Sequence, residues 1–121
     1  MLTRLSTKPV LLAAALTVAS WIAAAPVAEA QDAAVVKKGQ EVYNAQKCSI
    51  CHSIAGKGGK ASPLDGVATK LSAADIRQWI THPVDAAAKH KSTKKPVMPN
   101  KYGSLPAADI DAMVAYMQTL K

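Results

Sequence analysis

The chain contains two cysteines, and they lie three positions apart in the segment Cys48-Ser49-Ile50-Cys51-His52. Two thiols at this spacing can each bond a vinyl group of one porphyrin, and the histidine that follows then places an imidazole under the iron. The segment therefore predicts a c-type haem attachment site. We expect one covalently bound haem c, held by Cys48 and Cys51, with His52 as an iron ligand.

The same cysteines could in principle serve other kinds of site. A thioredoxin-like redox pair needs a βαβ context, and a zinc site usually needs about four nitrogen or sulfur ligands. The chain has no second cysteine pair, and its other histidines, His82 and His90, lie far along the sequence. Haem attachment is the interpretation that the residues favour.

The second axial ligand decides what a haem with one histidine does. An open site can bind gases or peroxide, whereas a thioether closes the site and raises the reduction potential, which suits electron transfer. Met98 lies between Pro96 and Pro99 in a hydrophilic segment, where no apolar helix face explains it. The prolines stiffen the backbone that presents its sulfur, so we expect Met98 to be this ligand.

Other candidates for that position remain open. Met98 could be an exposed loop methionine, and Met113 and Met117 fall on an apolar helical stripe, where methionine usually fills the core. His82 or His90 would give bis-histidine ligation instead. His82 is explained more simply as a polar residue at a helix C-terminus.

Three helices are predicted to position these residues, because apolar side chains recur at helical spacing in three places. Their apolar positions are Val35, Gly39, Val42 and Tyr43 in the first, Ile76, Trp79 and Ile80 in the second, and Ile110, Met113, Val114 and Met117 in the third. The first helix should begin at Asp32, the second at a capping box from Ser72 to Asp75, and the third at Pro106. No alternating strand pattern appears, so we predict an all-α domain.

The segments between the helices are predicted to be loops. Ser53 to Gly66 is rich in glycine and should pass along the haem edge, and Pro83 to Tyr102 is polar and basic, with a turn of helix possible at residues 86–88. Gly39 is costly inside a helix, so we expect another element to approach its backbone closely. The alternative is that the first helix ends there.

Residues 1–30 have the features of a secretory signal peptide. Arg4 and Lys8 precede an apolar run over residues 10–25, and Ala28-Glu29-Ala30 matches a cleavage site. The run is shorter than the ~20 residues of a membrane-spanning helix. We predict cleavage after Ala30, export to the periplasm and no membrane span afterwards; retention of the segment as an anchor is the alternative.

The remaining residues 31–121 form one small basic domain. Its 91 residues include 13 Lys and Arg against 7 Asp and Glu. So short a chain can bury only a limited core, and haem would complete it. In an exported protein, nucleic acid is not the expected target of this positive charge. We expect an acidic protein or an anionic membrane surface instead.

These motifs together resemble those of the bacterial class I c-type cytochromes over residues 31–121. The matching residues are Gly39 and Tyr43 on the first helix, Cys48, Cys51 and His52 at the haem, Pro63-Leu64-Asp65-Gly66, Met98-Pro99, and Met113 with Tyr116 on the last helix. The resemblance implies a small cytochrome c fold of three or more helices wrapped around one haem, with the terminal helices crossing at Gly39.

The resemblance also implies roles for two further residues. The carbonyl of Pro63 is expected to accept a hydrogen bond from the second ring nitrogen of His52, which fixes the tautomer. Trp79 resembles a tryptophan that lies near a haem propionate in many members of the family.

The expected function is that of a periplasmic, monomeric electron carrier and not of an enzyme. Basic residues such as Lys57, Lys60, Lys94 and Lys95 would rim the haem edge and orient it toward an acidic redox partner. The alternatives are a haem peroxidase or gas-binding cytochrome with a labile sixth ligand, or a haem subunit of a larger oxidoreductase complex.

Overall fold

The structure, a computed structural model, describes residues 25–121 and consists mainly of helices around one core. The helices are α1 (Ala25–Ala45), α2 (Val67–Lys70), α3 (Ala73–Thr81), α4 (Pro83–Lys89) and α5 (Ala107–Met117), with short 3-10 helices η1 (Cys48–Ile50) and η2 (Asn100–Ser104). Strands β1 (Ser53–Ile54) and β2 (Lys57–Gly58) form a small antiparallel hairpin. The expected all-α fold is confirmed, and the two-residue strands are a local addition to it.

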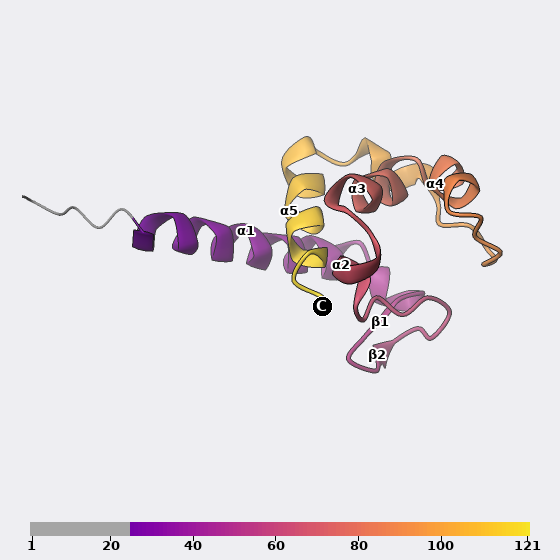
Figure 1. Ribbon diagram of the computed structural model, residues 1–121, viewed down its shortest axis with the longest axis horizontal. Helices are drawn as coiled ribbons and strands as arrows, with labels where there is room; N and C mark the ends of the chain where they lie inside the picture. The colour runs from indigo at the N-terminus through magenta and orange to yellow at the C-terminus, as the bar shows by residue number, and fades with distance from the viewer. Residues whose placement is uncertain (1–24) are drawn as a thin grey trace, which may run out of the picture.

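The long helix α1 and the last helix α5 cross each other, and α1 extends well beyond the crossing (Figure 1). The crossing is close because Gly39 has no side chain: a Cβ there would collide with the backbone carbonyl of Ala112 and with Tyr116 Cβ. This confirms the expected close approach. The alternative, a helix end at Gly39, is wrong, because α1 continues to Ala45.

The apolar faces of α1, α3 and α5 meet in the core. Its buried members are Val42, Tyr43, Ile76, Ile80, Ile110, Met113, Val114 and Met117. All eight belong to the predicted stripes. Two expected core positions are exceptions: Val35 is 42% exposed, and Trp79 is only partly buried.

The helix boundaries follow local chemistry, with two corrections. Helix α3 begins as expected, since Ser72 Oγ accepts a hydrogen bond from the Asp75 amide 3.1 Å away. The first helix begins at Ala25 instead of Asp32, and the chain after α3 forms a second helix, α4, instead of a single turn. Pro83 explains the latter, because it ends α3 yet suits the first turn of α4.

The predicted signal peptide lies outside the described residues, except for residues 25–30 in the first turns of α1. Its cleavage stays a prediction. Within residues 25–121, no helix has both the length and the apolar character needed to cross a bilayer.

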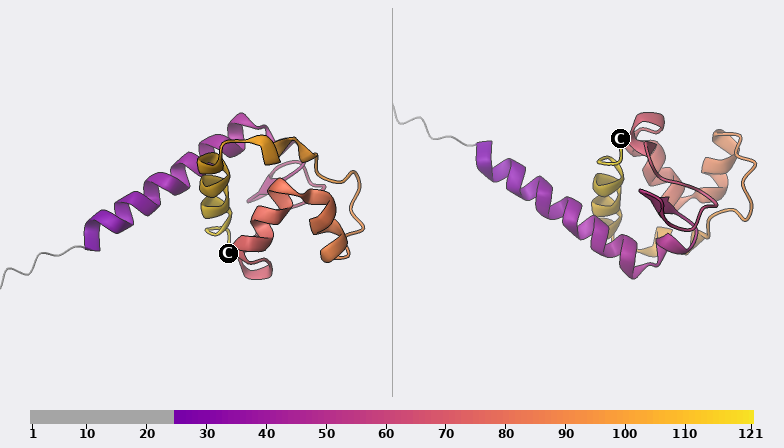
Figure 2. Two further views of the ribbon diagram at one scale, coloured as in Figure 1. Left: turned by 90° about the horizontal axis from the view of Figure 1, so that it is seen from above. Right: turned by 90° about the horizontal axis from the view of Figure 1, so that it is seen from below.

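The segment 90–99 leaves α4 and returns past the outer side of the molecule toward η2 and α5 (Figure 2). It therefore lies across the core from α1. Met98 is half-buried in this segment.

We expect Gly39→Ala to lower the free energy of unfolding of the haem-bound protein by about 1–3 kcal/mol, the usual range for overpacking. The added methyl group meets the backbone of α5, which cannot rotate away. Urea unfolding followed by circular dichroism measures the loss. Gln40→Ala, at the exposed neighbouring position, is the control and should change stability little. A Gly39→Ala protein as stable as the wild type would contradict the close helix contact.

Candidate functional site

A large apolar cavity lies beside the core, and the chemically notable residues of the sequence line it. Its volume is about 820 Å³, within the ~300–1,000 Å³ typical of small-molecule and cofactor sites. The wall includes Cys48, Cys51 and His52 together with Trp79 and Met98. Segments that are far apart in sequence thus converge on one space.

The cysteines and the histidine reach the cavity because the chain turns sharply after α1. Lys47 adopts a left-handed conformation with φ 56°, and η1 follows immediately. The His52 amide donates a hydrogen bond to the Cys48 carbonyl 3.0 Å away, which keeps the segment in one tight turn. Cys48 and Cys51 form no disulfide with each other, and burial raises the pKa of the Cys48 thiol. One turn of chain therefore offers two thiols and an imidazole to the same cavity.

The ring of His52 is oriented by the backbone. Its Nδ1 lies 2.8 Å from the carbonyl oxygen of Ser62. A carbonyl can only accept, so Nδ1 carries the proton and Nε2 keeps its lone pair for a metal. The expected acceptor was the carbonyl of Pro63, and this is wrong by one residue: Pro63 lines the cavity, but the preceding peptide faces the ring.

Met98 lines the cavity from the segment 90–99, and so do Met113 and Met117 of α5. The two α5 methionines are 3% and 6% exposed and belong to the hydrophobic core, as expected for core fillers. Met98 belongs to no such cluster of buried side chains. It therefore supplies a thioether from a part of the wall that core packing does not account for.

The two remaining histidines differ in position. His82 does not belong to the cavity wall, and its Nδ1 lies 2.8 Å from the Thr81 hydroxyl. His90 lines the cavity, where its ring stacks on Trp79 with centroids 6.0 Å apart. Trp79 thus lines the cavity, and its place near a haem propionate stays a prediction.

Asp75 ties this part of the wall together. Its carboxylate accepts hydrogen bonds from the Ser72 hydroxyl at 2.7 Å and from Lys89 Nζ at 2.6 Å, and His90 Nε2 lies 3.4 Å away. The hydrogen bonds from Lys89 and Ser72 hold the pKa of Asp75 far below its ordinary value. The start of α3 is thereby linked to the end of α4.

The loops on the two sides of the cavity are also connected. Lys94 Nζ donates a hydrogen bond to the Ala61 carbonyl 3.0 Å away. Lys94 belongs to the segment that carries Met98, and Ala61 precedes the residue that orients His52. Sequence reasoning missed this contact and the Ser62 carbonyl, because neither depends on a distinctive side chain.

Lysine dominates the charge of the wall. The cavity-lining lysines are Lys47, Lys70, Lys91, Lys94, Lys95 and Lys101, and Asp65 is the acidic residue among the lining. Lys94 and Lys95, which were expected at the haem edge, line the cavity. Lys57 and Lys60 do not line the cavity: Lys57 lines a smaller pocket beyond Tyr43, and Lys60 lines neither of these two cavities.

Comparison with known proteins gives one match. The family model described as Cytochrome c matches residues 36–121. Neither the curated proteins nor the solved structures contain a significant match to the chain. The matched range contains α1 from Val36 onward and every other element described above.

The Asp75 contacts predict a pH-dependent stability. Because the pKa of Asp75 is lowered on folding, its contribution is present above the unfolded-state pKa of ~3.9 and is lost as the pH falls toward the folded-state value. We expect Asp75→Asn to be less stable than the wild type to urea at pH 7. The difference should shrink at about pH 3, and Asp85→Asn, also on an early helical turn, is the control. Equal gaps at both pH values would contradict the ionic role.

Proposed function

Because the chain belongs to the cytochrome c family, we propose that it is an exported carrier of single electrons between redox partners. The observation that carries the proposal is the convergence of Cys48, Cys51, His52 and Met98 on one cavity of about 820 Å³. Haem c is the covalently bound cofactor of this family, and the cavity is large and apolar enough to hold it.

The residues have distinct roles in this proposal. Cys48 and Cys51 would bond the porphyrin, and His52 and Met98 would bind the iron. When bound, the haem supplies a one-electron couple between ferric and ferrous iron. His52 is presented through Nε2 because Ser62 accepts the proton of Nδ1 at 2.8 Å. The thioether of Met98 would occupy the remaining coordination position and favour the ferrous state.

Much of the wall around this site is apolar. Ile76, Ile80, Met113 and Met117 provide buried apolar surface beside the cavity. Exclusion of water from the metal's surroundings raises its potential and limits competing ligands. A site with two permanent protein ligands leaves no position for a substrate, which is why we assign electron carriage and no catalysis.

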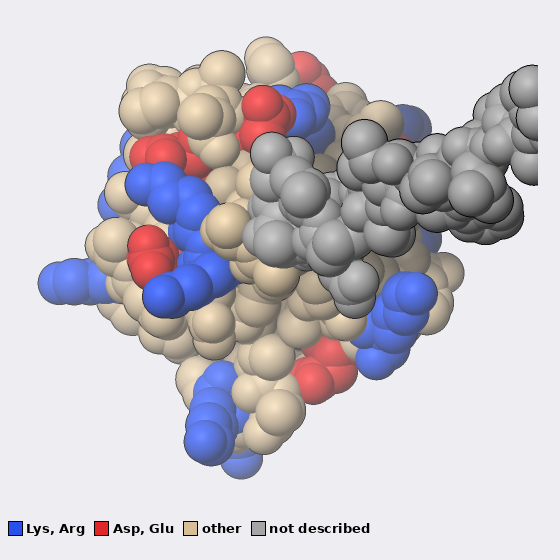
Figure 3. All heavy atoms as spheres, turned by 90° about the vertical axis from the view of Figure 1, so that its left-hand side faces the viewer, with Lys and Arg blue, Asp and Glu red and all other residues tan. Residues whose placement is uncertain are grey.

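The lysines of the cavity wall suit an acidic partner. Six lysines and one aspartate line the cavity, so this surface is strongly positive. On the face that carries the N-terminal end of α1, by contrast, basic and acidic side chains are interspersed (Figure 3). We propose that an acidic redox protein docks at the lysine-lined edge, that the contact is transient and salt-sensitive, and that the carrier is monomeric and periplasmic.

We expect reduced protein to show a c-type haem spectrum that carbon monoxide leaves unchanged, because Met98 fills the sixth position. Met98→Ala should bind carbon monoxide and have a lower reduction potential. Val97→Ala, at the neighbouring cavity-lining position, is the control and should stay closed. If the wild-type protein binds carbon monoxide readily, the carrier proposal fails and a gas-binding or peroxidase function replaces it.

Electron exchange with small ions tests where the positive docking surface lies. Lys95→Glu and Lys60→Glu change the net charge equally, yet only Lys95 lines the cavity. At low ionic strength, Lys95→Glu should slow oxidation by ferricyanide several-fold and speed oxidation by a cationic cobalt complex, because charge acts most strongly near the site of transfer. Equal effects of the two variants in stopped-flow measurements would contradict the proposed surface.

A further inference from the structure

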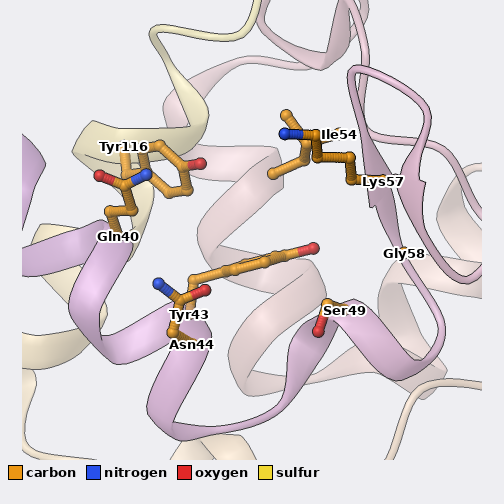
Figure 4. Close-up of a pocket in the computed structure, with 8 residues that line it drawn as sticks. All are labelled: Gln40, Tyr43, Asn44, Ser49, Ile54, Lys57, Gly58 and Tyr116. Atoms are coloured by element: carbon orange, nitrogen blue, oxygen red, sulfur yellow. The ribbon is translucent and has the colours of Figure 1, made fainter.

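Tyr43 forms the wall between two cavities. It lines the large cavity and also a smaller one of about 450 Å³, bounded by α1, the β1–β2 hairpin and α5. Figure 4 shows its ring lying across the floor of the smaller cavity, below Tyr116 and Lys57. Tyr43 is only 5% exposed, so its hydroxyl needs a partner inside the protein.

That partner is the main chain of the proposed axial ligand. The Tyr43 hydroxyl donates a hydrogen bond to the carbonyl oxygen of His52 at 3.1 Å. A carbonyl oxygen can only accept, so the phenol is the donor in this contact.

The other polar groups of His52 also have hydrogen-bond partners. Its amide bonds the Cys48 carbonyl, and its Nδ1 faces the Ser62 carbonyl. Gly58 packs so closely on the His52 carbonyl that a Cβ at this position would collide with it. Tyr43 supplies a hydrogen bond on the side toward α1, so the carbonyl has little freedom to move.

We propose that the Tyr43 hydroxyl is a positioning group for the axial histidine and raises the reduction potential of the haem. This goes beyond the proposed function and rests on it, because it takes His52 as the iron ligand. The positive end of the hydroxyl dipole offsets the negative end of the His52 carbonyl. Without it, the uncompensated carbonyl favours the ferric state, which carries one more positive charge, and the potential falls.

Tyr116 provides a matched comparison. Its ring meets that of Tyr43 edge to face, with centroids 5.9 Å apart. It lines the smaller cavity and not the larger one, and its hydroxyl points into the smaller cavity (Figure 4). Removal of either hydroxyl deletes one oxygen from the same aromatic pair, but only Tyr43 touches His52.

The test compares Tyr43→Phe with Tyr116→Phe in haem-loaded protein. Potentiometric titration should give a lower reduction potential for Tyr43→Phe, and proton NMR of the ferric protein should show shifted haem-methyl resonances, which report the orientation of the axial histidine. Tyr116→Phe should match the wild type in both. If Tyr43→Phe loses stability to urea but keeps the wild-type potential and methyl shifts, its role is only structural and the proposal is overturned.

A measurement on the wild type keeps the proposal testable if Tyr43→Phe does not fold. The Tyr43 hydroxyl proton should exchange slowly with solvent and should change its NMR frequency between the ferric and ferrous states. Rapid exchange, or a frequency indifferent to oxidation state, would overturn the proposal. Carbon monoxide binding by the wild type would contradict the carrier proposal and not the role of Tyr43. Carbon monoxide competes with the proposed Met98 ligand and not with His52.

Discussion

The position of the whole haem site depends on one close contact, the crossing of α1 and α5 at Gly39. No side chain separates the two backbones there, and α1 continues as a helix from the crossing to Ala45. The left-handed Lys47 and the turn of η1 follow within three residues of the end of α1. The position of α1 at the crossing therefore determines where Cys48 and Cys51 lie. A residue with a side chain at position 39 would move α5 and the cavity wall that it contributes.

The cavity explains why so short a chain needs a cofactor. Eight buried side chains from three helices form the core, but the space beside them is about 820 Å³ and is lined by apolar groups. A small domain cannot leave such a volume open at low cost in free energy. Covalently bound haem supplies the missing apolar surface, so the cofactor that carries the electron also completes the core.

The hydrogen bonds of His52 both stabilise the local chain and orient the imidazole ring. Its amide, carbonyl and ring each have a defined partner, provided in turn by Cys48, Tyr43 and Ser62. The Lys94 contact with Ala61 connects the loop beside Ser62 to the segment of Met98. Interactions that order the chain around the cavity thus also orient the His52 ring that lines it.

Local features were predictable from the sequence because they depend on neighbouring residues. The thiol spacing implied haem attachment, the Ser72 cap marked the start of α3, and the apolar stripes identified the eight core residues. The starts of α1 and α4 were missed: Pro26, which suits a first helical turn, falls within the predicted signal peptide, and Pro83 both stops one helix and begins another.

The chemistry of the site was therefore determined by the sequence itself, because two thiols and an imidazole act together only at short, fixed spacing. The tertiary structure decided which carbonyl orients His52, which tyrosine reaches its peptide and which lysines line the cavity. Ser62 acts through its backbone, which every residue possesses, and Lys94 and Lys60 are the same side chain in similar basic loops. Their roles differ only because the path of the chain brings one and not the other to the cavity.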